Sequence, residues 1–122
     1  MERAGREVVF GGDTAYTDLF ARLRDRTNPV DLMLMPIGAY DPWIRAHCSP
    51  EEATEMVRQA GARTFVPIHH ETFKLSSEPI DEPARRLRAA WSKSPERLLA
   101  VSVGETFRVP LDRSGERARA WA

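Results

Sequence analysis

The sequence predicts an α/β protein built on a mostly parallel sheet. Short apolar or β-branched runs alternate along the chain with segments whose apolar residues recur at helical intervals. The run from 30 to 37 is nearly all apolar, which is typical of a central strand covered on both faces. The run from 49 to 61 carries helix start and stop signals around an amphipathic pattern. These observations predict three strand-helix pairs followed by two more strands.

The first expected strand is Glu7 to Phe10, a β-branched and aromatic run that stops at two glycines. A helix is expected next, ending before Pro29, because the apolar residues after Thr14 share one helical face. These residues are Tyr16, Leu19, Phe20 and Leu23. The central strand follows and ends in the loop 36–42.

The clearest helix signal begins at Ser49 and ends near Ala60. Ser49 can cap the helix, Pro50 suits its first position, and Glu52 can complete a capping box. Gly61 then supplies a left-handed terminator. We therefore expect a helix of about three turns here.

The later elements are a strand at Thr64 to Ile68, a helix starting near Pro83, and two final strands. The final strands are expected at 98–103 and 106–109, with a turn at Gly104 and Glu105 between them. The chain is expected to form one domain, 1–122, with flexible ends at 1–6 and 110–122.

Composition excludes several classes of function. The chain has 18 basic and 18 acidic side chains, and this zero net charge argues against nucleic-acid binding by phosphate neutralisation. The single Cys48 excludes an internal disulfide, and it is either buried packing or, beside His47, a soft ligand or reactive thiol. No apolar run reaches the length of a signal peptide or a transmembrane segment. A soluble, cytoplasmic protein is expected.

Polar side chains follow each of the first three expected strands. Asp13 follows the first, Tyr40 and Asp41 the second, and His69 the third. Parallel strands bring their carboxyl ends to one edge, so these side chains are expected to meet there. A carboxylate and an imidazole suit a divalent ion such as zinc, although Asp13 alone could cap a helix and His69 could be a hydrogen-bonded loop residue. Of His69 and His70, one is expected to point inward and the other to be peripheral.

Five ordered segments carry a more specific resemblance. The chain resembles the C-terminal half of the metallo-β-lactamase fold hydrolases, and within them the N-acylphosphatidylethanolamine-hydrolysing phospholipase D group. The resemblance covers about Val8 to Leu87. The segments that carry it are Gly12-Asp13-Thr14, Pro36 to Tyr40, His47, Pro50 to Ala53, and Ile68 to Phe73.

The resemblance implies half of an αββα sandwich, with helices on one face of the sheet, and a two-metal hydrolytic site that usually holds zinc. Asp13 matches the carboxylate that bridges both metals, and His69 matches the last histidine ligand. His47 matches a histidine that orients or protonates the phosphate ester, with Tyr40 and Asp41 on the same rim. The implied reaction is attack by metal-activated hydroxide on a small-molecule or lipid phosphodiester.

The family's His-x-His-x-Asp-His motif is not among these residues, which include three histidines. Two interpretations remain open. In one, the chain is the C-terminal part of a hydrolase that is inactive without an N-terminal half, separate or lost by truncation. In the other, it is a structural or vestigial half-domain that forms a homodimer through its exposed sheet. The exposed apolar residues would be Val8, Phe10, Leu32 and Leu34.

Overall fold

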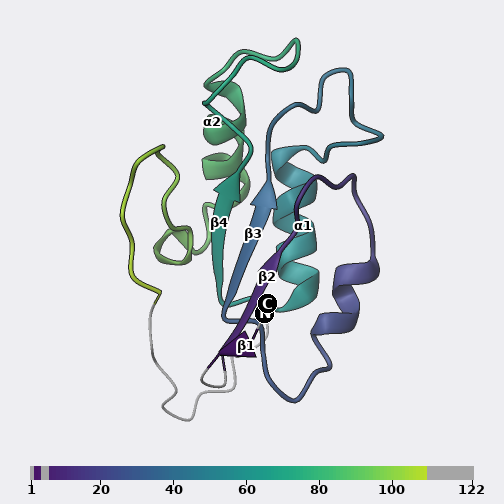
Figure 1. Cartoon of the computed structure of the whole chain (residues 1–122), viewed down its shortest axis with the longest axis vertical. Helices are drawn as coiled ribbons and strands as arrows, with labels where there is room; N and C mark the ends of the chain where they lie inside the picture. The colour runs from purple at the N-terminus through teal and green to yellow at the C-terminus, as the bar shows by residue number, and fades with distance from the viewer. Residues whose placement is uncertain (1, 4–5, 110–122) are drawn as a thin grey trace.

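The computed structural model describes residues 2–3 and 6–109 of the chain (Figure 1). The expected flexibility of 110–122 and of residues 1, 4 and 5 therefore concerns residues outside the described ones. Within the N-terminal stretch, strand β1 (Glu2–Arg3) pairs antiparallel with strand β2 (Arg6–Phe10). No sequence pattern marked β1.

The sheet has four strands in the order β1-β2-β3-β4. Strands β2, β3 (Leu32–Pro36) and β4 (Thr64–Ile68) are parallel, and their register places Leu34 opposite both Phe10 and Val66. The predicted α/β class with a mostly parallel sheet is confirmed. Because the three strands run in one direction, the chain leaves all of them at the same edge, called the carboxyl edge below.

Two α-helices cover one face of the sheet, as expected: both lie behind the strands in Figure 1. Helix α1 (Pro50–Ala60) begins with the predicted capping box between Ser49 and Glu52 and ends at Gly61, whose φ is 68°. Helix α2 (Glu82–Ala90) follows a long loop and packs against α1.

The core lies between this sheet face and the two helices. Its large side chains are fully buried and come from β3, β4, α1 and the end of α2: Met33, Met35, Phe65, Met56, Leu87 and Trp91. Phe65 and Trp91 meet edge to face, with ring centroids 5.4 Å apart. This core fixes the strands whose ends carry the candidate site.

The helix expected after β2 is only partly present. The structure has a short 3₁₀ helix, η1 (Leu19–Leu23), and the side chain of Asp18 makes no capping hydrogen bond to it. Phe20 and Leu23 pack against the core, whereas Tyr16 and Leu19 are exposed. The four apolar residues therefore do not share a buried face, and the prediction of a longer helix from their spacing is wrong.

The two strands predicted at 98–103 and 106–109 are also wrong. After the 3₁₀ helix η2 (Pro95–Arg97), Leu98 forms one isolated parallel bridge with Phe65, and the Leu99 amide donates to the Phe65 carbonyl at 2.8 Å. Ala100 then has a φ of 50°, which is incompatible with an extended strand. The ladder therefore stops one residue after the bridge.

The sheet face opposite the helices is partly open among the described residues. Phe10 is 69% exposed and Val8 and Leu34 are half-buried, whereas Leu32 is buried. Residues predicted to lie on this face thus divide into exposed and covered ones. Separately, the described part of the chain contains no helix that is both long and apolar enough to span a membrane.

Candidate metal centre

The carboxyl edge brings together three side chains that can bind a metal ion. Asp13, His47 and His69 each offer one ligand atom, and these atoms all lie within 4.8 Å of one another. The His69 Nε2 atom lies 3.7 Å from the Asp13 Oδ1 atom, which is too long for a hydrogen bond. The rings of His47 and His69 are stacked, with centroids 5.1 Å apart and planes inclined by 10°. These three residues are called the edge cluster below.

The edge cluster contains nitrogen atoms without protein partners. The Nδ1 atoms of His47 and His69 are buried and make no hydrogen bond to any described residue. The Asp13 side chain is 67% exposed, so the cluster opens to solvent on that side. A buried polar atom is costly unless something binds it. On the side of Asp13, to which the His69 Nε2 atom lies nearest, a cation would find imidazole and carboxylate donors. The donor set fits a divalent ion such as zinc, which takes three protein ligands in catalytic sites.

Two glycines place Asp13. The Gly11 amide donates to the Leu34 carbonyl at 2.8 Å, and a Cβ at Gly11 would lie 2.5 Å from the Met35 Sδ atom. Gly12 has a φ of 60°, a conformation that glycine adopts without strain. The chain therefore passes close to β3 and turns sharply, which delivers Asp13 to the edge.

The loop after β3 places His47. The Cys48 amide donates to the Thr14 carbonyl at 2.8 Å, and the Cys48 thiol donates to the Pro36 carbonyl at 3.3 Å. These bonds tie the end of the loop both to the residue after Asp13 and to the end of β3. His47 is thereby held beside Asp13 although the two residues are 34 positions apart in the sequence.

His69 lies in a backbone turn that is unusual for histidine. Its φ is 60°, and non-glycine residues in this left-handed region are strained. Gly38 lies against the turn: a Cβ there would be 2.2 Å from the His69 carbonyl oxygen. The Ile37 amide also donates to the Ile68 carbonyl at 3.1 Å. The segment after β3 thus packs directly on the turn that carries His69.

Tyr40 and Asp41, expected at the substrate rim, have different surroundings. Tyr40 is buried, and its hydroxyl donates to Glu82 Oε1 at 2.7 Å while Arg86 lies over its ring. Burial, together with the Glu82 carboxylate, raises the pKa of Tyr40 well above its ordinary value. Asp41 is exposed, and its backbone is bonded to the loop before α2. The tyrosine contacts are directed to α2, and a role for either residue at the rim stays a prediction.

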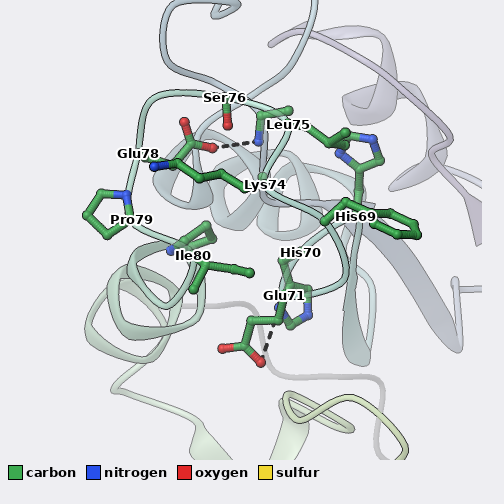
Figure 2. A pocket seen from close by; sticks show the side chains of 13 residues that line it. His69, His70, Glu71, Lys74, Leu75, Ser76, Glu78, Pro79 and Ile80 are labelled. Atoms are coloured by element: carbon green, nitrogen blue, oxygen red, sulfur yellow. Dashed lines mark hydrogen bonds and ion pairs between the residues drawn. The ribbon is translucent and has the colours of Figure 1, made fainter.

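His70 points away from His69, as Figure 2 shows. Its side chain is 4% exposed, and burial lowers its pKa, so the ring is neutral at pH 7. It borders a small hollow of about 20 Å³ beside the loop 71–80, enough for about one water molecule. His69 belongs to the edge cluster, whereas His70 points away from it. The two adjacent histidines therefore point in different directions, as expected for neighbouring residues.

Cys48 is completely buried, and burial raises the pKa of its thiol to about 12. The thiol therefore stays protonated at neutral pH, when a metal ligand would need to be a thiolate. This favours packing over the other two roles considered for Cys48.

Comparisons with known proteins agree with this architecture. A family model described as a β-lactamase superfamily domain matches residues 1–70, more than half of the chain. The chain therefore belongs to the β-lactamase superfamily. The metallo-β-lactamase fold protein YhfI from Bacillus subtilis aligns with a TM-score of 0.51 and 23% identity, over 70% of this chain and 33% of that chain. This likeness shows the fold, and the predicted resemblance to part of a metallo-β-lactamase fold hydrolase is confirmed.

Curated relatives are similar over most of the chain. An uncharacterized protein of Mycobacterium tuberculosis is 45% identical over 68% of this chain. A mitochondrial N-acyl-phosphatidylethanolamine-hydrolyzing phospholipase D of Saccharomyces cerevisiae is 34% identical over 84%, and a UPF0173 metal-dependent hydrolase of Methanoculleus marisnigri is 31% identical over 92%. The chain spans 23%, 24% and 46% of these proteins, respectively.

Proposed function

We propose that the chain contributes the edge cluster to a metal-dependent hydrolase of phosphodiesters, with zinc as the metal. The observation that carries the proposal is the convergence of Asp13, His47 and His69 within 4.8 Å at the carboxyl edge. The metal dependence of one relative and the phospholipid substrate named for another support it. A cytoplasmic location is part of the same proposal.

The three residues of the edge cluster would have different roles in this reaction. Asp13 and His69 would hold the ion from the ends of two different strands. His47, stacked on His69, lies where it can either complete the ligand set or orient and protonate the leaving oxygen. When bound, a divalent ion supplies Lewis-acid polarisation of the ester and a more acidic water. Three ligands serve one zinc, so a two-metal site requires donors beyond the edge cluster, from the same or another polypeptide.

Metal content tests the ligand assignment. The chain is purified without chelator, and its zinc is quantified by plasma mass spectrometry and by competition with a chromophoric chelator. Asp13→Ala and His69→Ala are each expected to weaken zinc binding by roughly 100-fold or more, since loss of a ligand costs at least as much as loss of a residue that supports one. His47→Ala separates its two roles, because a ligand loss weakens binding and a substrate-orienting loss does not.

Matched controls lie close by. Asp18→Ala removes an exposed carboxylate whose side chain caps nothing, and His70→Gln changes the adjacent histidine that points away from the cluster. Both are expected to keep wild-type zinc affinity. Zinc that survives both the Asp13 and the His69 substitutions would remove the assignment.

A second candidate function rests on the exposed Phe10. In this alternative, two copies associate through the open sheet face, and the half-domain is structural or vestigial. Light scattering is expected to show a dimer that Phe10→Lys converts to monomer, with Phe73→Lys as a control at another exposed phenylalanine. A wild-type chain that is monomeric at all accessible concentrations excludes the alternative.

A further inference from the structure

A buried carboxylate lies in the otherwise exposed loop between β4 and α2. Glu78 is 7% exposed, whereas its neighbours Ser77, Pro79 and Ile80 are exposed, and Figure 2 shows its side chain turned inward. A buried carboxylate is unfavourable unless hydrogen bonds satisfy it. The partners of Glu78 therefore indicate why the loop folds this side chain inward.

Those partners are backbone amides of the segment that follows β3. The Ala39 amide donates to Glu78 Oε1 at 2.7 Å, and the Asp41 amide donates to Glu78 Oε2 at 3.1 Å. The Ser77 amide returns a bond to the Asp41 carbonyl at 2.8 Å. Although burial raises the pKa of Glu78, hydrogen bonds from the Ser76 side chain and these amides hold it below its ordinary value. The ionised Glu78 carboxylate thus holds the amides of Ala39 and Asp41, which lie on either side of Tyr40. This pair of hydrogen bonds is called the clamp below.

The segment 38–41 adopts a backbone conformation that its residues do not favour on their own. Ala39 has a φ of 63°, which alanine disfavours, so external bonds are needed to keep it there. The same segment contains Gly38, which lies in contact with the His69 carbonyl. A chain of contacts therefore leads from the Glu78 carboxylate through Ala39 and Gly38 to the turn that presents His69.

We propose that Glu78 is a positioning residue for the edge cluster: by clamping segment 38–41 onto the His69 turn, it fixes the His69 imidazole relative to His47 and Asp13. The contact path carries this inference, and Glu78 itself touches none of the three ligand residues. It deepens the proposed function by naming what holds the ligand in place, and it rests on that function only in assigning a metal to the cluster.

Glu78→Gln tests the clamp with little change of size. One side-chain oxygen can still accept an amide, but the new NH₂ group faces the other N–H donor, so one bond is lost. Glu105→Gln is the matched control, because that exposed carboxylate also accepts a backbone amide, from Ser102, in a segment remote from the edge cluster. Circular dichroism checks that both variants fold.

Two readouts follow the position of His69. Without metal, the nuclear Overhauser effect between the His47 and His69 ring protons is expected to weaken in Glu78→Gln and to persist in Glu105→Gln. With Zn²⁺, Glu78→Gln is expected to bind about 10- to 100-fold more weakly, the usual cost of losing a residue that orients a ligand. Unchanged ring contact and unchanged zinc affinity in Glu78→Gln overturn the proposal.

The outcomes separate this inference from the proposed function. If the wild-type chain binds no Zn²⁺, the metal assignment fails, and the metal-free ring contact still decides the role of Glu78. If Glu78→Gln does not fold, hydrogen exchange in the wild-type chain decides instead. The Ala39 and Asp41 amides are then expected to exchange much more slowly than the exposed Thr72 amide, and equally fast exchange overturns the clamp.

Discussion

The core between the sheet and the helices differs from the carboxyl edge in how well each satisfies ordinary rules of protein structure. In the core, apolar side chains are fully buried and helix α1 has a complete capping box. At the edge, Ala39, His69 and Glu71 have positive φ values, and His47, His69 and His70 each have a buried Nδ1 atom without a hydrogen-bond partner among the described residues. Such departures concentrate where a protein binds or reacts, since stability alone would not keep them.

The two regions are held by different forces. The core is stabilised by apolar burial, and Trp91 packs edge to face on Phe65. The indole N–H of Trp91 donates to the Ser94 carbonyl at 2.8 Å. The edge depends on backbone hydrogen bonds that cross between loops, above all those to Glu78 and from Cys48 to Thr14. Substitutions in the core should therefore change stability, and substitutions at the edge should change binding.

The same substitution in both regions gives the largest expected contrast. Trp91→Ala is expected to lower the free energy of unfolding by about 3–5 kcal/mol, because Trp91 is 1% exposed and its removal leaves a cavity. Trp43 lies in the loop between β3 and α1 and is 56% exposed, so Trp43→Ala should lower the free energy of unfolding by about 0.5 kcal/mol or less. Urea denaturation measures both. If both variants lose the same free energy of unfolding, the distinction between a core stabilised by buried contacts and an edge made of exposed loops is wrong.

The core was the more predictable region from sequence. Helix α1 begins and ends as expected because its signals are local: Ser49, Pro50 and Glu52 at the start and Gly61 at the end act on their own neighbours. The predicted strands near the C-terminus failed because pairing depends on a distant edge. Their residues favour strands, but the positive φ of Ala100 turns the chain away from β4 after one bridge.

The candidate site was only partly accessible to sequence reasoning. Asp13 and His69 could be placed at one edge because parallel strands end together, and chain order is enough to apply that rule. The stacking of His47 on His69 depends on the path of a loop that no local pattern specifies. Glu78 carried no signal at all, since a glutamate beside a proline in a polar loop is ordinary, and only its burial against Ala39 and Asp41 distinguishes it.

A smaller effect on stability than that of Trp91→Ala is expected at His69, and it has the opposite sign. His69→Gly removes the strain of a left-handed non-glycine residue and is expected to raise the free energy of unfolding by about 1 kcal/mol, while zinc binding is lost. Ala100→Gly relieves the same kind of strain at a residue, φ 50°, that lies outside both the edge cluster and the clamped segment, so it should stabilise by a similar amount and leave zinc affinity unchanged. Thermal unfolding and zinc titration of both variants check this. If His69→Gly instead lowers the free energy of unfolding as a core truncation does, packing of the imidazole stabilises the protein more than the left-handed backbone costs. The conformation of His69 would then not indicate stability lost for metal binding.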